Sequence, residues 1–495
     1  MMHTNPFDDD KLHEECGVFG IYGNNEAAAM TALGLHALQH RGQEACGIVA
    51  FDGNDFYAHK ALGLVDATFS KADVMERLQG HVAIGHNRYS TTGESSLRNV
   101  QPLYADLASG GFAVAHNGNL TNAQTLREEL VQRGSLFQST SDTEVIIHLM
   151  AVSQKKSATD RLIDAVNQIK GAYSLVACCD NMLIGLRDPL GIRPLALGKL
   201  GDAYILASET CAFDIIGADF VRDVKPGEMV VIDAMGLRSL KPFAEVGDRL
   251  CVFEYVYFAR PDSYMEGRSV YEARKKIGAV LAAEAPCPQA DVIVPVPDSG
   301  VPSAIGYAEA SGIPFELGII RNHYVGRTFI EPTAQIRHLG VKLKHNANKV
   351  FLKDKIVVLV DDSIVRGTTS KKIVEMVRAA GAKEVHMRIA SPPTTHSCFY
   401  GIDTPEKEDL LAHHYNVEEI AKKIGVDSLA YISADGLYQA LGKTGRDNAA
   451  PQFCDACFTG DYAVELTDKS PAGCGGGGCG TKRMSVIHER HHIKA

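Results

Sequence analysis

The chain has 495 residues, of which 45% are hydrophobic and 22% are charged, and its formal net charge is -10. This length exceeds one ordinary hydrophobic core, so we expect two large globular domains. The acidic balance argues against nucleic acid as the main partner, because a phosphate backbone requires a basic face. No apolar run approaches the ~20 residues that span a bilayer, which argues against a membrane partner.

The chain begins with MMHTNPFDDDKLHEE, an acidic stretch without the apolar segment of a secretory signal. We therefore expect a cytoplasmic protein whose 12 cysteines are thiols or metal ligands, not disulfides. Cys16 follows directly, at the start of the strand-like run 18–22. A cysteine in this position is most often a small buried hydrophobic residue.

Further motifs follow Cys16 in the first half of the chain. They are LHALQHRGQEACGI (35–48), GHNRYSTTG (85–93), AHNGNLTN (115–122) and STSDTEV (139–145). Together with CGVFG they resemble the class II glutamine amidotransferases, which are N-terminal-nucleophile hydrolases with a four-layer αββα fold. The segments RDPLGIRP, ASETCAF and VKPGEM, which end at residue 229, also fit this family.

This resemblance implies that Cys16 is the nucleophile of a glutaminase. Cys16 must first become the chain start, because a free α-amino group has a pKa of ~7.7–8.0 and can act as a base. Residues 1–15 would then be a propeptide, and the alternative is a plain disordered terminus. By matching position, Asn117 and Gly118 resemble the oxyanion hole, Arg88 the clamp for the glutamine carboxylate and Asp142 the partner of its ammonium group.

Each of these residues also has a purely structural interpretation. Asn-Gly is a strong hairpin-turn signal, so Asn117 and Gly118 alone would predict a turn. Arg88 alone would be a surface arginine, and Asp142 alone would cap a helix that contains residues 145–150. The catalytic prediction depends on the whole set, since no single member is specific.

A second unit begins near residue 245. CVFEYVYFARPDS (251–263) has a strand-rich start and an Arg-Pro pair, which suggests a boundary before it. Strands then alternate with helical segments, as in ADVIVPVPDSG, KIVVLVDDS and EVHMRIASPP. This alternation predicts a doubly wound parallel sheet that binds ligands at the carboxyl ends of its strands. We expect a propeptide at 1–15, domains at 16–245 and 246–469, and a flexible tail at 470–495.

The stretch 355–370, KIVVLVDDSIVRGTTS, combines a buried strand, the pair Asp361 and Asp362, a small-residue turn and a helix start. Free backbone N–H groups and the helix dipole attract phosphate at such a turn. The carboxylates can accept hydrogen bonds from sugar hydroxyls or hold a hard cation. An ordinary turn and cap is the alternative. The order of these features resembles the phosphoribosyl pyrophosphate signature of the type I phosphoribosyltransferases.

That family resemblance assigns further roles. Asp361 and Asp362 would hold the ribose, directly or through Mg²⁺, with Ser299 as a third magnesium ligand. The residues that would cradle the 5-phosphate are Arg366, Gly367, Thr368, Thr369 and Ser370. The loop 321–346 is rich in arginine and lysine and includes Lys342, which we expect to contact the pyrophosphate group. The alternative for this loop is a solvated basic surface.

Four cysteines of the second half form a candidate metal site. Cys454 and Cys457 make a C-x-x-C motif, and Cys251 and Cys398 lie in apolar contexts that flank strands. Four thiolates can hold a [4Fe–4S] cluster or zinc. The cluster-bearing bacterial amidophosphoribosyltransferases carry cysteines in matching contexts, CxxEYxYFARPDS, SPP…CFYGID and CxACFTG. This resemblance favours the cluster, with a structural or oxygen-sensing role.

Both halves, in this order, resemble the amidophosphoribosyltransferase family along nearly the whole chain. The resemblance implies that glutamine, phosphoribosyl pyrophosphate and water give 5-phosphoribosylamine, glutamate and pyrophosphate, the committed step of purine synthesis. It also implies a buried passage for ammonia, feedback inhibition by purine nucleotides and a homotetramer.

Two other functions are open at this stage. A sugar-phosphate aminating synthase shares the first half, but it needs a sugar isomerase domain in place of VDDSIVRGTT. A transcriptional regulator built on a phosphoribosyltransferase fold needs a basic DNA-binding module, and it does not need Cys16 with its associated motifs.

Overall fold

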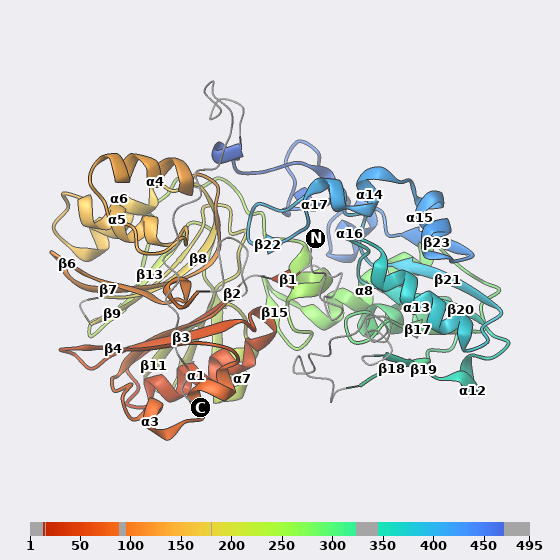
Figure 1. Ribbon diagram of the computed structural model, residues 1–495, viewed down its shortest axis with the longest axis horizontal. Helices are drawn as coiled ribbons and strands as arrows, with labels where there is room; N and C mark the ends of the chain where they lie inside the picture. The colour runs from red at the N-terminus through yellow and green to blue at the C-terminus, as the bar shows by residue number, and fades with distance from the viewer. Residues whose placement is uncertain (1–12, 15, 89–95, 180, 323–344, 470–495) are drawn as a thin grey trace.

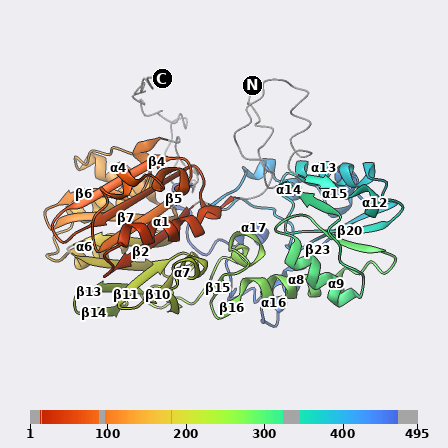
Figure 2. The same ribbon diagram turned by 90° about the horizontal axis from the view of Figure 1, so that it is seen from below.

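The structure is a computed structural model that describes residues 13–14, 16–88, 96–179, 181–322 and 345–469. It consists of two lobes, with the N-terminal half of the chain in one and the C-terminal half in the other (Figure 1). A view turned by 90° shows the same division (Figure 2). Lys342 and the glycine-rich tail lie outside the described residues. In the described part, no helix has the length and apolar character needed to cross a membrane.

The first lobe contains two sheets, counted over the described residues. The seven-stranded sheet has the order β12 (Asp219–Asp223), β10 (Ala196–Leu200), β11 (Ala203–Ala207), β2 (Cys16–Tyr22), β5 (Val82–Arg88), β3 (Ala45–Phe51) and β4 (Phe56–Leu62). The six-stranded sheet has the order β14 (Gly236–Leu240), β13 (Met229–Asp233), β9 (Met182–Arg187), β8 (Gly171–Cys179), β7 (Gly110–Leu120) and β6 (Leu103–Leu107). Apolar side chains of both sheets, such as Val18 and Val176, form one core between them.

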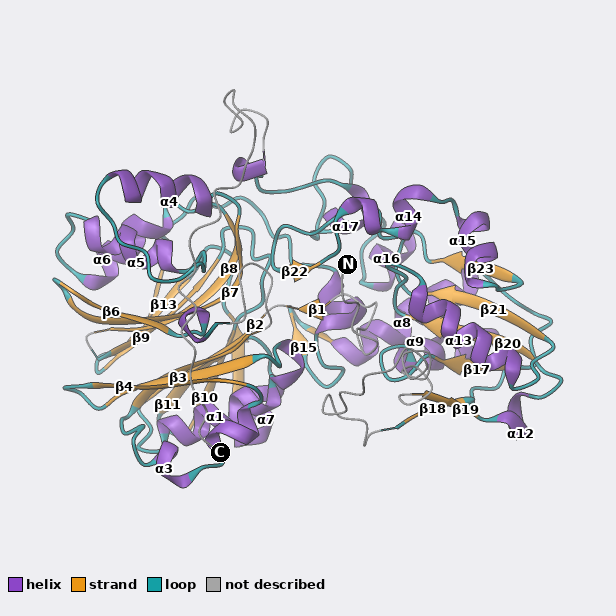
Figure 3. Ribbon diagram, viewed as in Figure 1, coloured by secondary structure: helices purple, strands orange, loops and turns teal. Residues whose placement is uncertain are grey.

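Helices cover the outer faces of both sheets (Figure 3). The seven-stranded sheet carries α1 (Ala27–Ala37), α2 (Val65–Phe69), α3 (Ala72–Met75) and α7 (Cys211–Ile216). The six-stranded sheet carries α4 (Ala123–Gln132), α5 (Glu144–Val152) and α6 (Ala158–Val166). The lobe therefore has the four αββα layers that the sequence resemblance implied.

The second lobe is built on a parallel sheet. Within the described ranges its order is β17 (Val292–Pro295), β20 (Ile356–Asp361), β21 (Glu384–Ile389) and β23 (Ser428–Tyr431). One face packs against α8 (Val270–Glu284), α9 (Val301–Ser311) and α16 (Ala434–Ala440), and the other packs against α13 (Thr368–Ala379) and α15 (Val417–Ile424). Successive residues of β20 enter opposite cores, which is the pattern of a strand covered on both faces. The predicted doubly wound parallel sheet is confirmed.

Short elements complete the second lobe and its border with the first. They are β15 (Tyr264–Met265), β16 (Arg268–Ser269), β18 (Ile319–Arg321), β19 (His345–Ala347), α12 (Lys349–Leu352), β22 (Ile402–Asp403), α14 (Leu411–His414) and α17 (Ala456–Thr459). Strand β1 (His13–Glu14) of the leader pairs antiparallel with β22. The end of the leader is therefore held by the second lobe, immediately before Cys16.

The strand-rich start predicted for the second unit is wrong. Residues Glu254–Phe258 form a π-helix, although their aromatic residues favour a strand. Arg274 on α8 donates to the carbonyls of Tyr255 (2.8 Å) and Ala259 (2.7 Å). These hydrogen bonds from Arg274 satisfy carbonyl groups of the buried helical turn, and the local sequence does not reveal them. Tertiary contacts therefore outweigh the strand preference of these residues.

A buried group of charges joins the two lobes. Arg41 of the first lobe donates to Glu209 and, with Nη2 2.6 Å from Oε2, to Glu254 of the second lobe. Arg193 Nη2 lies 3.1 Å from the other oxygen of Glu254, and all four side chains are 0% exposed. Burial lowers the pKa of Arg41, but Glu254 and Glu209 outweigh burial and hold that pKa above its ordinary value.

The chain after α17 returns to the first lobe. Glu465 accepts a hydrogen bond at its carbonyl from Thr121 Oγ1 (2.7 Å). The Asp468 carboxylate accepts from the backbone N–H groups of Gln124 (2.9 Å) and Thr125 (3.1 Å). Because these are among the first N–H groups of α4, an acceptor from the far end of the chain caps that helix. Figure 1 shows this segment beside α4.

We expect Arg41→Met to destabilise the protein strongly, because Glu209 and Glu254 would stay buried with one cation fewer. Removal of one partner of a buried ion pair costs about 3–5 kcal/mol in the free energy of unfolding. Thermal denaturation followed by circular dichroism measures the change. Arg77→Met is the matched control, since Arg77 and Asp73 form a pair that is 69% and 74% exposed. Equal melting temperatures for the two variants would contradict a stabilising role for the buried group.

Two candidate active sites

Cys16 is the first residue of β2 and is 8% exposed. Its partner on the neighbouring strand is Arg88, the last residue of β5. Arg88 is 7% exposed, so its interpretation as a surface arginine is wrong. The pairing of β2 with β5 therefore brings a thiol and a buried guanidinium to the same end of the sheet, although 72 positions separate them in the sequence numbering.

Asn117 and Gly118 lie inside β7, so the hairpin turn that Asn-Gly alone predicts is wrong. The side chain of Asn117 is 0% exposed, and within the described residues neither its Nδ2 nor its Oδ1 has a hydrogen-bond partner. An unpaired buried amide costs about 1–3 kcal/mol, and in a native structure it calls for an explanation such as an absent ligand. Strand β7 lies opposite β2 in the facing sheet.

Gly118 requires glycine for two reasons. Its φ is +137°, which residues other than glycine rarely adopt. A Cβ at this position would also lie 2.0 Å from the carbonyl oxygen of Ala172 on β8. The backbone of Gly118 is therefore pressed against the neighbouring strand. A backbone donor that is fixed in this way, next to an unpaired amide, is the arrangement that an oxyanion hole needs.

Asp142 lies beside the end of β7. Its Oδ2 accepts from the backbone N–H of Leu120 (3.0 Å) and lies 3.8 Å from His116 Nδ1. Burial lowers the pKa of His116 and Asp142 offsets only part of this, so we interpret the contact as one between a neutral imidazole and a carboxylate. Helix α5 begins at Glu144 without a side-chain cap, so Asp142 is not the predicted helix cap.

Glu144 orders the loop that carries Asp142, a role that sequence reasoning missed. Its carboxylate accepts from Gln138 N, Ser139 N and Ser139 Oγ, each at 2.7 Å. Burial raises the pKa of Glu144, but the hydrogen bonds from His148, Gln138 and Ser139 outweigh it and lower the pKa to about 2. The sequence signal was present, because Glu144 belongs to the same STSDTEV motif as Asp142.

The acidic pair of the second lobe lies where the sequence predicts it. Asp361 ends β20, Asp362 follows, and both are 1% exposed. Asp362 accepts from Ser363 Oγ (2.8 Å) and from Ser299 Oγ. Ser299 stands in the loop between β17 and α9. The carboxyl ends of two adjacent parallel strands thus bring Ser299 and the acidic pair together.

The small-residue turn after this pair is the start of a helix. Gly367 occupies the N-cap of α13 with φ +77° and provides no side-chain acceptor for the helix N–H groups. An N-terminus of this kind attracts an anion through its N–H groups and dipole. Around it, Arg366 and Thr368 are exposed, Thr369 is half-buried and Ser370 is buried. The turn therefore presents both a cation and hydroxyl groups to solvent next to Asp361 and Asp362.

Arg274 is a residue near this site that sequence reasoning missed. It is 2% exposed on α8, and its pKa falls to about 10 because burial outweighs the opposite effects of Asp362 and Glu209. Its charge therefore lies close to the acidic pair from the interior of the lobe. The signal in the sequence was an arginine within the apolar stripe formed by Val270 and Ile277.

Three of the four candidate cluster cysteines are buried, and Cys398 is half-buried. Burial raises the pKa of Cys251, Cys454 and Cys457, that of Cys454 to about 12, and the neighbouring thiols Cys251, Cys398 and Cys454 add to the rise. Cys251 and Cys454 form an isolated β-bridge. Over the described residues, no group of three or more His, Cys, Asp or Glu is arranged to hold a metal ion. The four thiols thus gather in one region without enclosing a single ion.

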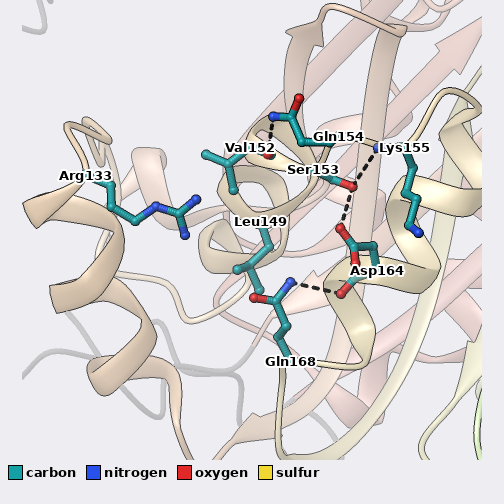
Figure 4. Close-up of a pocket in the computed structure, with 8 residues that line it drawn as sticks. All are labelled: Arg133, Leu149, Val152, Ser153, Gln154, Lys155, Asp164 and Gln168. Carbon is teal, nitrogen blue, oxygen red and sulfur yellow. Dashed lines mark hydrogen bonds between the residues drawn. The ribbon is translucent and has the colours of Figure 1, made fainter.

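A surface pocket of ≈ 360 Å³ lies elsewhere, at the end of α5 (Figure 4). Its lining combines the cations Arg133 and Lys155 with Asp164, whose Oδ2 accepts from Ser153 Oγ (2.5 Å). None of the predicted site residues belongs to this lining. The pocket is therefore separate from both candidate sites.

Family models match both lobes. A model described as a glutamine amidotransferase domain matches residues 86–214, and one described as a phosphoribosyl transferase domain matches residues 283–391. The amidophosphoribosyltransferase of Rhizobium etli is 58% identical over 94% of this chain and 95% of its own length. The enzyme of that name from Bacillus subtilis is 49% identical over 92% of this chain and 95% of its own length.

Solved structures agree with these matches. One described as the allosteric regulatory enzyme of purine biosynthesis has a TM-score of 0.87 at 48% identity, covering 91% of this chain and 97% of that one. The glutamine phosphoribosylpyrophosphate amidotransferase of B. subtilis, complexed with ADP and GMP, has a TM-score of 0.86 at 48% identity, covering 91% and 98%. At this identity and coverage, the chain belongs to the amidophosphoribosyltransferase family, the glutamine-dependent glycosyltransferases of the first step of purine biosynthesis.

Proposed function

We propose that the chain converts glutamine, phosphoribosyl pyrophosphate and water to 5-phosphoribosylamine, glutamate and pyrophosphate through two linked sites. The observation that carries this proposal is the presence, in one chain, of a thiol at the start of β2, an unpaired buried amide on the contacting strand β7, and an acidic strand end followed by a glycine-capped helix. The first arrangement suits amide hydrolysis and the second suits a phosphorylated sugar. A parallel sheet with this acidic pair also disfavours the sugar isomerase domain of an aminating synthase.

The glutaminase reaction would begin with removal of the leader. Cleavage of the bond before Cys16 creates an α-amino group that can take the thiol proton near neutral pH. The thiolate then attacks the side-chain amide carbon of glutamine, and a γ-glutamyl thioester forms as ammonia leaves. Water hydrolyses the thioester and releases glutamate. The pairing of β1 with β22 supports a defined position for the leader before cleavage.

Four residues would serve this chemistry. Asn117 Nδ2 and the N–H of Gly118 would donate to the oxyanion of each tetrahedral intermediate. Arg88 would bind the α-carboxylate of glutamine with its planar guanidinium, and Asp142 would bind the α-ammonium group. The burial of Arg88 and the position of Asp142 beside the end of β7 support these roles.

In the second site, Asp361 and Asp362 would bind the ribose hydroxyls, and residues 366–370 would hold the 5-phosphate at the start of α13. A magnesium ion bound by Ser299, Asp361 and Asp362 would neutralise pyrophosphate as a leaving group. The contact between Ser299 and Asp362 supports this ligand set. Lys342 and its neighbours would attract the pyrophosphate. Ammonia from the first site would then add to C1 of the ribose, through a passage that excludes water.

We propose an iron–sulfur cluster rather than one zinc ion at the four cysteines, because their sequence contexts resemble those of the cluster-bearing members of the family. Cys251, Cys398 and Cys454 each raise the pKa of at least one neighbouring thiol, which supports a common site for the four cysteines. Tyr400 N also donates to Cys398 Sγ (3.3 Å), and N–H···S bonds of this kind tune cluster thiolates. Cys251, Cys398, Cys454 and Cys457 would hold a [4Fe–4S] cluster with a structural or oxygen-sensing role.

Regulation and assembly follow from the family. Because the B. subtilis structure contains ADP and GMP, we expect purine nucleotides to inhibit this enzyme. We further propose a homotetramer in the cytoplasm, supported by the similarity to the bacterial relatives. The domain limits 16–245 and 246–469 are our proposal as well, supported by the end of β14 at Leu240.

We expect Cys16→Ala to abolish activity with glutamine and to preserve activity with added ammonia, because only the first site uses the thiol. Pyrophosphate release, measured with each nitrogen donor, tests this. Cys46→Ala is a suitable control, since Cys46 is a buried thiol of β3 outside both sites. Loss of both activities in Cys16→Ala alone would contradict two separable sites.

The double substitution Asp361→Asn and Asp362→Asn should stop pyrophosphate release with either donor. Glutamate release from glutamine should continue in part, because its residues lie in the other lobe. Both products can be followed in one assay. The proposal would be wrong if this variant still released pyrophosphate at the parent rate with ammonia.

Intact-mass measurement and an iron assay on one purified sample test the leader and the cluster together. We expect a chain that starts at Cys16 and about four iron atoms per chain. Cys457→Ser should lower the iron content, whereas Cys287→Ser should not, since Cys287 is a buried cysteine outside the set. A colourless protein without iron would remove the cluster, and zinc in its place would establish the alternative.

A further inference from the structure

The loop after Cys398 reaches from the second lobe to the end of β7. Asn119 Nδ2 donates to the carbonyl of Phe399 at 2.9 Å. A Cβ at Gly401 would lie 2.8 Å from the Cα of Gly118, 3.1 Å from its carbonyl carbon and 3.6 Å from Asn119 N. The backbones of Gly401 and Gly118 are therefore in direct contact, with no side chain between them.

The backbone of Gly118 has little room to move away from this loop. On the β8 side, the carbonyl oxygen of Ala172 occupies the space that a Cβ of Gly118 would need. Gly118 is also paired with Tyr173 in the ladder between β7 and β8, which limits its movement on that side. Because Ala172 and Gly401 confine Gly118 from different directions, a shift at Gly401 must tilt the peptide groups that flank Gly118.

Gly401 has a second reason to be glycine, since its φ is +103°. The sequence CFYGID places it between a candidate cluster ligand, Cys398, and the strand β22 that pairs with the leader. Its position is therefore set from both sides by the second lobe. The second lobe thus places Gly401 against the Gly118 backbone.

We propose that Gly401 is a positioning residue for the glutaminase reaction, through which the second lobe aligns the Gly118 N–H with the oxyanion. This proposal rests on the oxyanion role of Asn117 and Gly118 given above. Gly401 touches neither glutamine nor the reacting atoms. It acts through the peptide groups of Gly118, while the bond from Asn119 to Phe399 holds the two segments together.

The test is Gly401→Ala, whose Cβ must displace the Gly118 backbone. We expect kcat for glutamine hydrolysis to fall by about 100-fold, the effect of losing one oxyanion donor, with a much smaller change in KM. Pyrophosphate release with added ammonia should match the parent. Asn119→Ala removes the hydrogen bond to Phe399 without adding a clash. We therefore expect a smaller fall in kcat for glutamine hydrolysis.

Alkylation of Cys16 by iodoacetamide separates positioning from general damage. The thiolate displaces iodide from a saturated carbon, so no oxyanion forms and the hole is not used. We expect Gly401→Ala to be alkylated at the parent rate, followed by intact mass, although it hydrolyses glutamine slowly. Asp468→Ala is the control, because it removes contacts between the lobes at α4 without touching Gly118, and all three rates should stay unchanged.

Several outcomes would overturn the proposal. Parent-like glutamine hydrolysis by Gly401→Ala would show that the loop does not set the oxyanion geometry, and a parallel fall in alkylation would show that Cys16 itself is disturbed. If Gly401→Ala also loses ammonia-dependent activity, Asn119→Ala becomes the deciding variant. Its glutamine hydrolysis and its alkylation at Cys16 are then judged in the same way. Failure of the proposed function has a different signature, since Cys16→Ala would then retain its activity with glutamine.

Discussion

The two-lobed structure depends on the contacts that the buried carboxylate of Glu254 makes with arginines of the first lobe. This carboxylate accepts hydrogen bonds from Arg41 of the first lobe and lies beside Arg193, and neither it nor the two arginines is exposed. A buried carboxylate is tolerated only with such partners, so separation of the lobes would leave charges unpaired in the interior. The carbonyls of its π-helix in turn accept from Arg274, whose charge lies near Asp362. These contacts link the lobe that contains Cys16 to the lobe that contains Asp362.

Two segments of the second lobe extend this connection to β7 and α4. The loop 399–401 contacts Gly118 and Asn119, and the arm that contains Asp468 caps α4 just beyond them. Both segments follow cysteines of the candidate cluster in the sequence. A cluster that joins those cysteines would therefore stabilise the parts of the second lobe that contact β7 and α4. This gives a structural reason for a cluster that the proposed chemistry does not use.

Much of the second site could be predicted because local rules decide it. A short β-branched run, an acidic pair and a glycine before a helix predict a strand, an acidic strand end and a turn into a helix within residues 355–370, and the structure has all three. The first lobe followed from its set of motifs. Single members of that set were misleading when taken alone, since Asn117 and Gly118 predict a turn but lie in the middle of a paired strand. Asn117 and Gly118 pair with Ser174 and Tyr173 of β8, and this pairing outweighs the turn preference of Asn-Gly.

The sequence by itself indicated which residues could carry the proposed chemistry, because the thiol of Cys16, the carboxylates of Asp361 and Asp362 and the helix start at Gly367 are properties of residue type and spacing. Only the tertiary structure decided which residues support them. The contacts of Arg41 with Glu254 and of Gly118 with Gly401 join positions that lie far apart in the chain, and no period or motif relates them. Such contacts depend on how the lobes pack, since backbone approach and charge pairing are decided by the surfaces that meet and not by local sequence.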